Sequence, residues 1–173
     1  GGRSFTTVAG KAPRAMVGTA DAVWGVACSD AHRCRVVRAD VAGHAFAETP
    51  SQPFARYSAA SLSPALLAAS DGDHAVVLQS GSRRYALTVD RGRDWAEHSA
   101  PCVPSAGSIA SGPDGSYWLL CAGQPSAGAQ PKQLYRSTDG VTWTKPGPVE
   151  GSGYASTVVP VGPDVAWRAG GRA

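Results

Sequence analysis

Lysine is scarce in this sequence, and the basic residues that it contains are dispersed. The 173 residues include 3 lysines and 13 arginines, carry a net charge of +3, and have no basic run longer than Arg83-Arg84. Nucleic-acid-binding proteins usually concentrate their positive charge in one patch or stripe. The sequence therefore disfavours a nucleic-acid partner.

Long apolar segments are also missing. No stretch approaches the roughly 20 consecutive apolar residues that a membrane-spanning helix needs, so we expect no membrane span. The first residues, "GGRSFTTV", have neither the charged start nor the apolar core of a signal peptide. We expect any export signal to have been removed or to lie upstream.

Motifs for metals, cofactors and common nucleophiles are absent as well. The sequence has no phosphate loop, no metal motif and no Ser-His-Asp order, so we expect no cofactor and no metal. The four cysteines form no Cys-x-x-Cys and lack the paired short spacings that zinc sites use. This favours two disulfides in an oxidising compartment over a zinc site or four buried thiols.

Turn-forming residues, by contrast, are abundant, with 21 glycines and 13 prolines. One turn pattern recurs: Ser/Thr-x-Asp-x-Gly-x-x-aromatic, with one residue of slack. We call each copy a box. The copies comprise Thr88, Asp90, Gly92 and Trp95; Ser137, Asp139, Gly140 and Trp143; and, in degraded form, Asp40, Gly43 and Phe46. The opening "GGRSF" has the form of the back half of a fourth copy.

The spacing of the boxes indicates a repeat. Their aromatic residues, from Phe5 to Trp143, follow at intervals of 41, 49 and 48 residues. A second marker runs in phase, an acidic turn before an apolar strand, at Asp21, Asp73, Asp114 and Asp164. Four-stranded propeller blades have this length. The sequence therefore predicts an all-β fold, a β-propeller of four-stranded antiparallel blades.

About three and a half such blades fit into the chain by this repeat count. Closed propellers have about 4–8 blades. We therefore expect part of a larger propeller, completed by further blades or by self-association. The expected blades cover residues 1–7 (the end of a blade), 14–50, 58–100, 106–147 and 154–173 (the start of a blade).

Turn chemistry explains the residue types of the box. An Asp side chain accepts backbone N–H groups within a tight turn, and Gly adopts a left-handed φ without strain. The aromatic residue can pack between neighbouring sheets. We therefore expect the Asp residues of the boxes to be structural rather than catalytic or metal-binding.

The boxes "TVDRGRDW" and "STDGVTW" resemble the Asp-box (BNR) repeats of sialidase-like β-propellers. The resemblance covers nearly the whole chain, and "VACSDAHRC" is similar to Cys-bearing hairpins of secreted bacterial propellers. It implies a secreted or cell-surface protein whose ligand binds on the face opposite the boxes. The family includes sialidases, other glycoside hydrolases, sortilin-type receptor domains and photosystem assembly factors.

The predicted topology also pairs the cysteines. If the box turns lie on one face, the loops that join the second strand to the third, and one blade to the next, lie on the other. Cys28 and Cys34 flank one such loop. Cys102 precedes the first strand of a blade, and Cys121 ends the neighbouring strand. We predict the disulfides Cys28–Cys34 and Cys102–Cys121.

Markers of sialidase catalysis are weak. As the resemblance implies, such enzymes use an arginine triad, a Tyr–Glu nucleophile pair and an acidic Asp. The sequence has only three Glu and lacks the expected Phe/Tyr-Arg-Ile-Pro segment. Glu150 and Tyr154, in one predicted loop of the ligand face, are the weak catalytic candidates. The other ligand-face candidates are His32, Arg33, Arg56, Tyr57, Arg83, Arg84, Gln124 and Lys132.

The sequence therefore favours a non-catalytic, secreted propeller module that binds protein or glycan. One alternative is a fragment of an exo-sialidase or related glycoside hydrolase. A second is a propeller like the photosystem assembly factors, which the expected disulfides disfavour.

Overall fold

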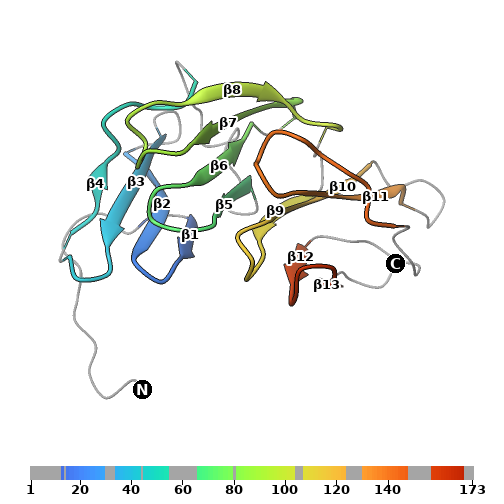
Figure 1. Ribbon diagram of the computed structural model, residues 1–173. Coiled ribbons are helices and arrows are strands. Elements are labelled where there is room, and N and C mark those ends of the chain that lie inside the picture. The colour runs from blue at the N-terminus through green and yellow to red at the C-terminus, as the bar shows by residue number, and fades with distance from the viewer. Residues whose placement is uncertain are drawn as a thin grey trace.

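The computed structural model of the chain is built from β-strands (Figure 1). It describes residues 13, 15–29, 34–43, 45–54, 66–79, 81–103, 107–123, 130–147 and 157–169. Within these ranges there are thirteen strands and no α-helix. The predicted all-β class is confirmed.

The strands form four antiparallel sheets, each built from segments that follow one another in the chain. Sheet 1 contains β1 (Ala15–Gly18), β2 (Ala22–Cys28), β3 (Cys34–Asp40) and β4 (Ala47–Glu48). Sheet 2 contains β5 (Leu67–Ala69), β6 (Ala75–Leu78), β7 (Arg84–Thr88) and β8 (Ala96–Ser99). Sheet 3 contains β9 (Ser108–Ser111), β10 (Tyr117–Ala122) and β11 (Lys132–Ser137), and sheet 4 contains β12 (Thr157–Pro160) and β13 (Ala166–Ala169).

One segment with strand-like sequence departs from the expected pattern. In sheet 3, "VTWTK" should form a fourth strand, but among the described residues it forms a single bridge between Thr144 and Arg136. The amides of Val141 and Thr142 donate to the Asp139 carboxylate instead of to a neighbouring strand. Arg136 and Thr144 exchange two backbone hydrogen bonds, each at 2.9 Å, and Pro146, two residues further on, has no N–H to extend the ladder.

The first strands of the sheets lie in series: β1 contacts β5, β5 contacts β9, and β9 contacts β12. Figure 1 shows the sheets following one another along an arc, with these first strands towards its inner side. The core is divided accordingly into three apolar clusters, one between each sheet and the next. Stability thus depends on sheet-to-sheet packing repeated along the chain.

A buried tryptophan connects sheet 1 to sheet 2. Trp24 of β2 is fully buried, and its indole N–H donates to the carbonyl oxygen of Asp71 at 2.9 Å. Arg38 lies over the Trp24 ring, and its Nε donates to the carbonyl oxygen of Gly72 at 2.8 Å. The turn that opens sheet 2 therefore satisfies buried donors of sheet 1.

Both predicted disulfides are present, Cys28–Cys34 and Cys102–Cys121. The first joins paired residues at the ends of β2 and β3, and the second ties the segment after β8 to β10. Two disulfides fit an extracellular protein. Among the described residues, no helix is long and apolar enough to cross a membrane.

Candidate functional site

The box turns and the turns after the first strands lie at one end of the sheets, which we call the box face. In sheet 3, for example, Tyr117 pairs with both Ser111 and Ser137, so the two turns that follow are neighbours. The connections β2–β3 and β6–β7, and those between sheets, leave from the other end, which we call the opposite face. Strand topology therefore gives the two faces that the sequence predicts.

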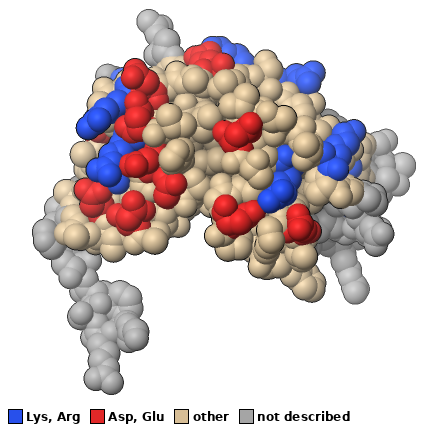
Figure 2. All heavy atoms as spheres, viewed as in Figure 1, with Lys and Arg blue, Asp and Glu red and all other residues tan. Residues whose placement is uncertain are grey.

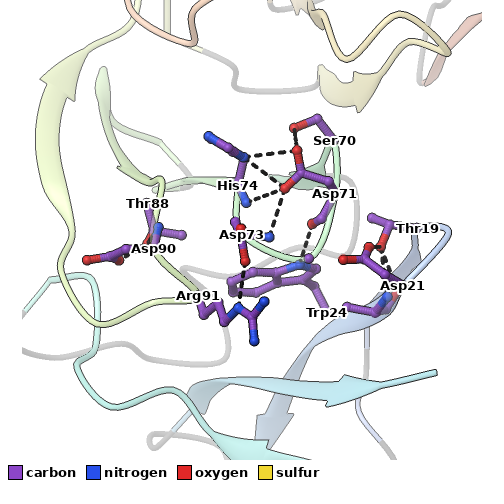
Figure 3. Close-up of polar contacts among 12 residues, drawn as sticks. Thr19, Asp21, Trp24, Ser70, Asp71, Asp73, His74, Thr88, Asp90 and Arg91 are labelled. Carbon is purple, nitrogen blue, oxygen red and sulfur yellow. Dashed lines mark hydrogen bonds and ion pairs between the residues drawn. The ribbon is translucent and has the colours of Figure 1, made fainter. Parts of the chain in front are cut away.

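The two intact boxes have the hydrogen bonds that turn chemistry predicts. Asp139 accepts from the Ser137 hydroxyl at 2.8 Å and from the amides of Val141 and Thr142 at 2.8 and 2.7 Å. Asp90 accepts from the Thr88 hydroxyl at 2.8 Å and from the Asp94 amide at 3.0 Å. Figure 3 shows the Thr88–Asp90 contact. Both carboxylates are thus engaged within their own turns.

These contacts also fix the charge state of the two carboxylates. The amides of Thr142 and Val141 hold the pKa of Asp139 well below its usual range. The Asp94 amide and the Thr88 hydroxyl likewise lower the pKa of Asp90. A general acid at neutral pH needs a raised pKa. Asp90 and Asp139 are therefore poorly suited to donate a proton to a substrate.

The glycines and aromatic residues of the intact boxes complete the turns. Gly92 and Gly140 adopt left-handed conformations, with φ of 76° and 74°. The Trp95 ring meets Trp24 edge-on at 6.3 Å, and the Trp143 indole donates to the Tyr85 hydroxyl at 3.1 Å. Each box tryptophan therefore joins its sheet to the preceding sheet.

The degraded box of sheet 1 is built differently. Asp40 forms an ion pair with Arg38 at 2.8 Å, and Gly43 is not among the described residues with positive φ. Phe46 is half-buried. This copy retains the acidic residue without the turn-pinning geometry.

On the opposite face, two candidate arginines have partners within the chain. Arg83 donates to the carbonyl oxygens of Ala100 and Pro101 at 3.1 and 2.9 Å. Arg84 forms an ion pair with Glu97 and lies over the Phe54 ring. These contacts hold the ends of β7 and β8 together, which gives both arginines a structural function.

The remaining opposite-face candidates are less informative. Lys132 begins β11, is half-buried, and pairs in register with Ala122. The other candidates lie outside the described residues, namely His32, Arg33, Arg56, Tyr57, Gln124, Glu150 and Tyr154.

The box face contains a cleft of about 310 Å³ between sheets 2 and 3, which we call the inter-sheet cleft. It is open to solvent and combines a few apolar walls with polar groups from three turns. Its lining residues are Ser70, Asp71, His74, Leu87, Val89, Asp114, Gly115, Tyr117, Thr138 and Asp139. The space-filling view in Figure 2 shows acidic side chains distributed over this side of the molecule, with arginines or lysines beside several of them.

A hydrogen-bonded Asp–His pair forms one wall of the cleft (Figure 3). Nδ1 of His74 lies 2.8 and 2.9 Å from the two carboxylate oxygens of Asp71. The same carboxylate accepts from the amides of Asp73 and His74, each at 2.8 Å. Burial raises the pKa of Asp71, but these hydrogen bonds outweigh it and leave the pKa below its usual value.

The polar groups on the other side of the cleft also have hydrogen-bond or ion-pair partners within the chain. The Tyr117 hydroxyl lies 3.2 Å from the Ser70 hydroxyl, and burial raises the pKa of Tyr117. Asp114 accepts from the Ser116 hydroxyl and pairs with Arg136, and these contacts lower its pKa to about 2. The cleft is therefore anionic at neutral pH and electrostatically unsuited to a phosphate or an acidic sugar.

Among the described residues, no group of three or more His, Cys, Asp or Glu side chains is arranged to hold a metal ion. The Asp–His pair was not predicted from the sequence. The acidic marker of this repeat was assigned to Asp73, which instead pairs with Arg91 at 2.6 Å. The sequence feature that could have indicated this pair is the spacing of Asp71 and His74, which lie three residues apart in a turn.

Comparison with known proteins does not place the chain in a family. No protein-family model matches the sequence, and no curated protein matches it either. The resemblance to Asp-box propellers therefore stays a prediction from the sequence motifs.

Proposed function

We propose that this chain is an extracytoplasmic module of the Asp-box β-propeller type, which binds a protein or a glycan and catalyses no reaction. The four sheets are its blades, arranged side by side around an axis near the first strands. Its ligand binds at the opposite face, to which the sequence assigns His32, Arg33, Arg56, Tyr57 and Gln124.

The series of first strands supports the propeller arrangement. In a propeller, successive antiparallel sheets pack face to face, with one strand of each sheet close to a central axis. The contacts β1–β5, β5–β9 and β9–β12, with one apolar cluster between each pair of sheets, are those expected of such an arrangement. The two disulfides support an extracytoplasmic location.

The state of the box carboxylates supports a structural rather than a catalytic role for the box face. Asp90 and Asp139 are held as carboxylates by donors of their own turns, and their lowered pKa values make them poor acids. Arg83 and Arg84, the two candidate arginines that the structure describes, make intramolecular contacts. Loops projecting from a rigid scaffold are where binding residues gather.

A paired assay tests the proposed function. The protein is incubated with a fluorogenic sialoside between pH 4 and pH 7, and is separately applied to a glycan array and to immobilised extracellular proteins. We expect no turnover. We expect captured ligand to be lost in Arg33→Ala or Arg56→Ala and retained in the matched Arg91→Ala variant, because Arg91 lies on the box face.

Turnover that Glu150→Gln abolishes would instead support the glycoside hydrolase alternative. Ligand capture that survives Arg33→Ala and Arg56→Ala, but is lost in Arg91→Ala, would place the binding surface on the box face and contradict the proposed location.

A further inference from the structure

Sheet 4 exposes a contiguous set of apolar side chains on the face that points away from sheet 3. Val159 and Trp167 are paired across β12 and β13, and Val161 and Val165 continue the same face towards the turn. All four side chains are exposed. We call this set the Trp167 face. An exposed apolar patch of this kind marks an interaction surface.

The other sheets of the repeat show which element covers the position equivalent to Trp167. In register, Trp167 corresponds to Trp24 of sheet 1 and Trp118 of sheet 3, because each lies on the second strand opposite an apolar residue of the first. Trp24 and Trp118 are 0% and 1% exposed, whereas Trp167 is 67% exposed. Trp24 packs on sheet 2, and Trp118 packs on Val158 of sheet 4. The missing cover is therefore another sheet.

The faces that cover Trp24 and Trp118 have a common chemistry. Sheet 2 presents Leu67, Ala69, Ala75, Val77 and Ala86 to sheet 1, and sheet 4 presents Val158 and Ala166 to sheet 3. These residues are small or aliphatic, and none is charged. Sheet 2 also offers the carbonyl oxygen of Asp71 to the Trp24 indole.

The chain itself carries a matching face on sheet 1. The strand register aligns Met16, Gly18 and Val23 with Leu67, Ala69 and Ala75 of sheet 2. We call these three residues of sheet 1 the Met16 face. Met16 is 61% exposed, and open space surrounds the position of a Cβ on Gly18. Val37 and Ala39, further along the same side of sheet 1, are already buried, so the accessible part lies on the β1 side.

From this complementarity we infer that the Trp167 face of one molecule docks on the Met16 face of a second copy of this chain. The contact corresponds to part of the packing that joins sheet 1 to sheet 2, in which a tryptophan lies against aliphatic residues of the next sheet. Such a head-to-tail contact is heterologous, so it closes into a ring or continues as a chain.

Mass measurement by light scattering after size-exclusion chromatography tests this docking. We expect the unmodified protein to have the mass of at least two copies. Trp167→Lys and Met16→Lys, which place charge on opposite sides of the same contact, should each reduce the mass to one copy. Val165→Lys provides a second variant of the Trp167 face. Val89→Lys is the matched control. Val89 is 58% exposed and belongs to neither face, so this variant should assemble like the unmodified protein.

Mixing the two single-copy variants gives the decisive result. Trp167→Lys retains the Met16 face, and Met16→Lys retains the Trp167 face. A mixture should therefore form a complex of two copies, although neither variant assembles alone. Circular dichroism should show that both variants are folded.

A single-copy mass for the unmodified protein at its highest soluble concentration would overturn the docking. Assembly that persists in Trp167→Lys and Val165→Lys, or a mixture that stays at the mass of one copy, would also overturn it.

Discussion

The intact boxes of sheets 2 and 3 differ from the degraded box of sheet 1 in a few residues. The comparison shows which residues the turn needs. In the intact copies, a hydroxyl from Thr88 or Ser137 and the following Asp bind the turn together. In sheet 1 the register places Ala39 at the hydroxyl position, and Asp40 pairs with Arg38 instead. The acidic residue alone therefore does not build the turn.

Sheet 1 nevertheless forms and packs, because other contacts replace those of the box. Trp24 and Arg38 donate to carbonyl oxygens of the turn that opens sheet 2. Trp95, from the box of sheet 2, packs against Trp24. An intact box therefore stabilises its own turn and also the preceding sheet. We expect changes in the intact boxes to cost more than equivalent changes in the degraded box.

The largest difference in stability between the intact and degraded boxes should appear at their glycines. Gly92→Ala forces a side chain into a conformation with φ of 76° and places its Cβ 2.6 Å from Cβ of Thr49. We expect a loss of about 3 kcal/mol in the free energy of unfolding, combining left-handed strain with overpacking. Gly43→Ala is the matched change and lacks the left-handed strain, so its loss should be below about 1 kcal/mol. Urea denaturation measures both, and equal losses would contradict the distinction between the boxes.

The second-largest difference in stability between the intact and degraded boxes should appear at their acidic residues. Asp139→Ala removes a charged acceptor from two amides and a hydroxyl, so we expect it to reduce the free energy of unfolding by about 2 kcal/mol. Asp40→Ala removes one ion-pair partner of Arg38, and the Asp40 side chain is itself 62% exposed, so we expect a cost of less than about 1 kcal/mol. The same urea titration measures both variants. A larger loss in Asp40→Ala would reverse the assignment of the pinned turn.

The box tryptophans should show a smaller effect. Trp143→Phe keeps a ring but removes the N–H that donates to the Tyr85 hydroxyl at 3.1 Å, so we expect a loss of about 1 kcal/mol. In a Tyr85→Phe background the same change should cost less, because the acceptor is already gone. A double-mutant cycle by thermal or urea unfolding measures this coupling, and strictly additive losses would show that the hydrogen bond contributes nothing.

The smallest effect is the pH dependence of the pinned turn. Because the pKa of Asp139 is lowered in the folded protein, its contribution is complete above its unfolded pKa, near 4, and is lost as the pH falls through the folded value. The stability difference between the unmodified protein and Asp139→Asn should therefore narrow as the pH is lowered below about 4. A difference that stays constant or widens on acidification would show that the carboxylate charge does not stabilise the turn.

The sequence predicted much of the fold because its signals are local. The all-β class was predictable because apolar and β-branched residues are bounded by turn residues, as they are in β2 and β11. The disulfide pairing followed from which strand ends share a face. The single Arg136–Thr144 bridge that stands in place of a fourth strand in sheet 3 was not predicted.

The candidate site was harder to predict, because it depends on contacts between sheets. Tyr117 and Ser70 are 47 residues apart and meet across the inter-sheet cleft. Arg83 and Arg84 had the composition of a binding surface, yet carbonyl oxygens and Glu97 engage them. The exposure of Trp167 likewise could not be predicted from its sequence motif, because Trp24 and Trp118 occur in similar motifs and are buried.

Hydrogen exchange at single amides tests the pinning of the intact boxes most directly. The Val141 and Thr142 amides should be protected in the unmodified protein, because both donate to Asp139. In Asp139→Ala these two amides should exchange faster, while those of β10 keep their protection. Unchanged exchange at Val141 and Thr142 in that variant would contradict the account of the box as a carboxylate-pinned turn.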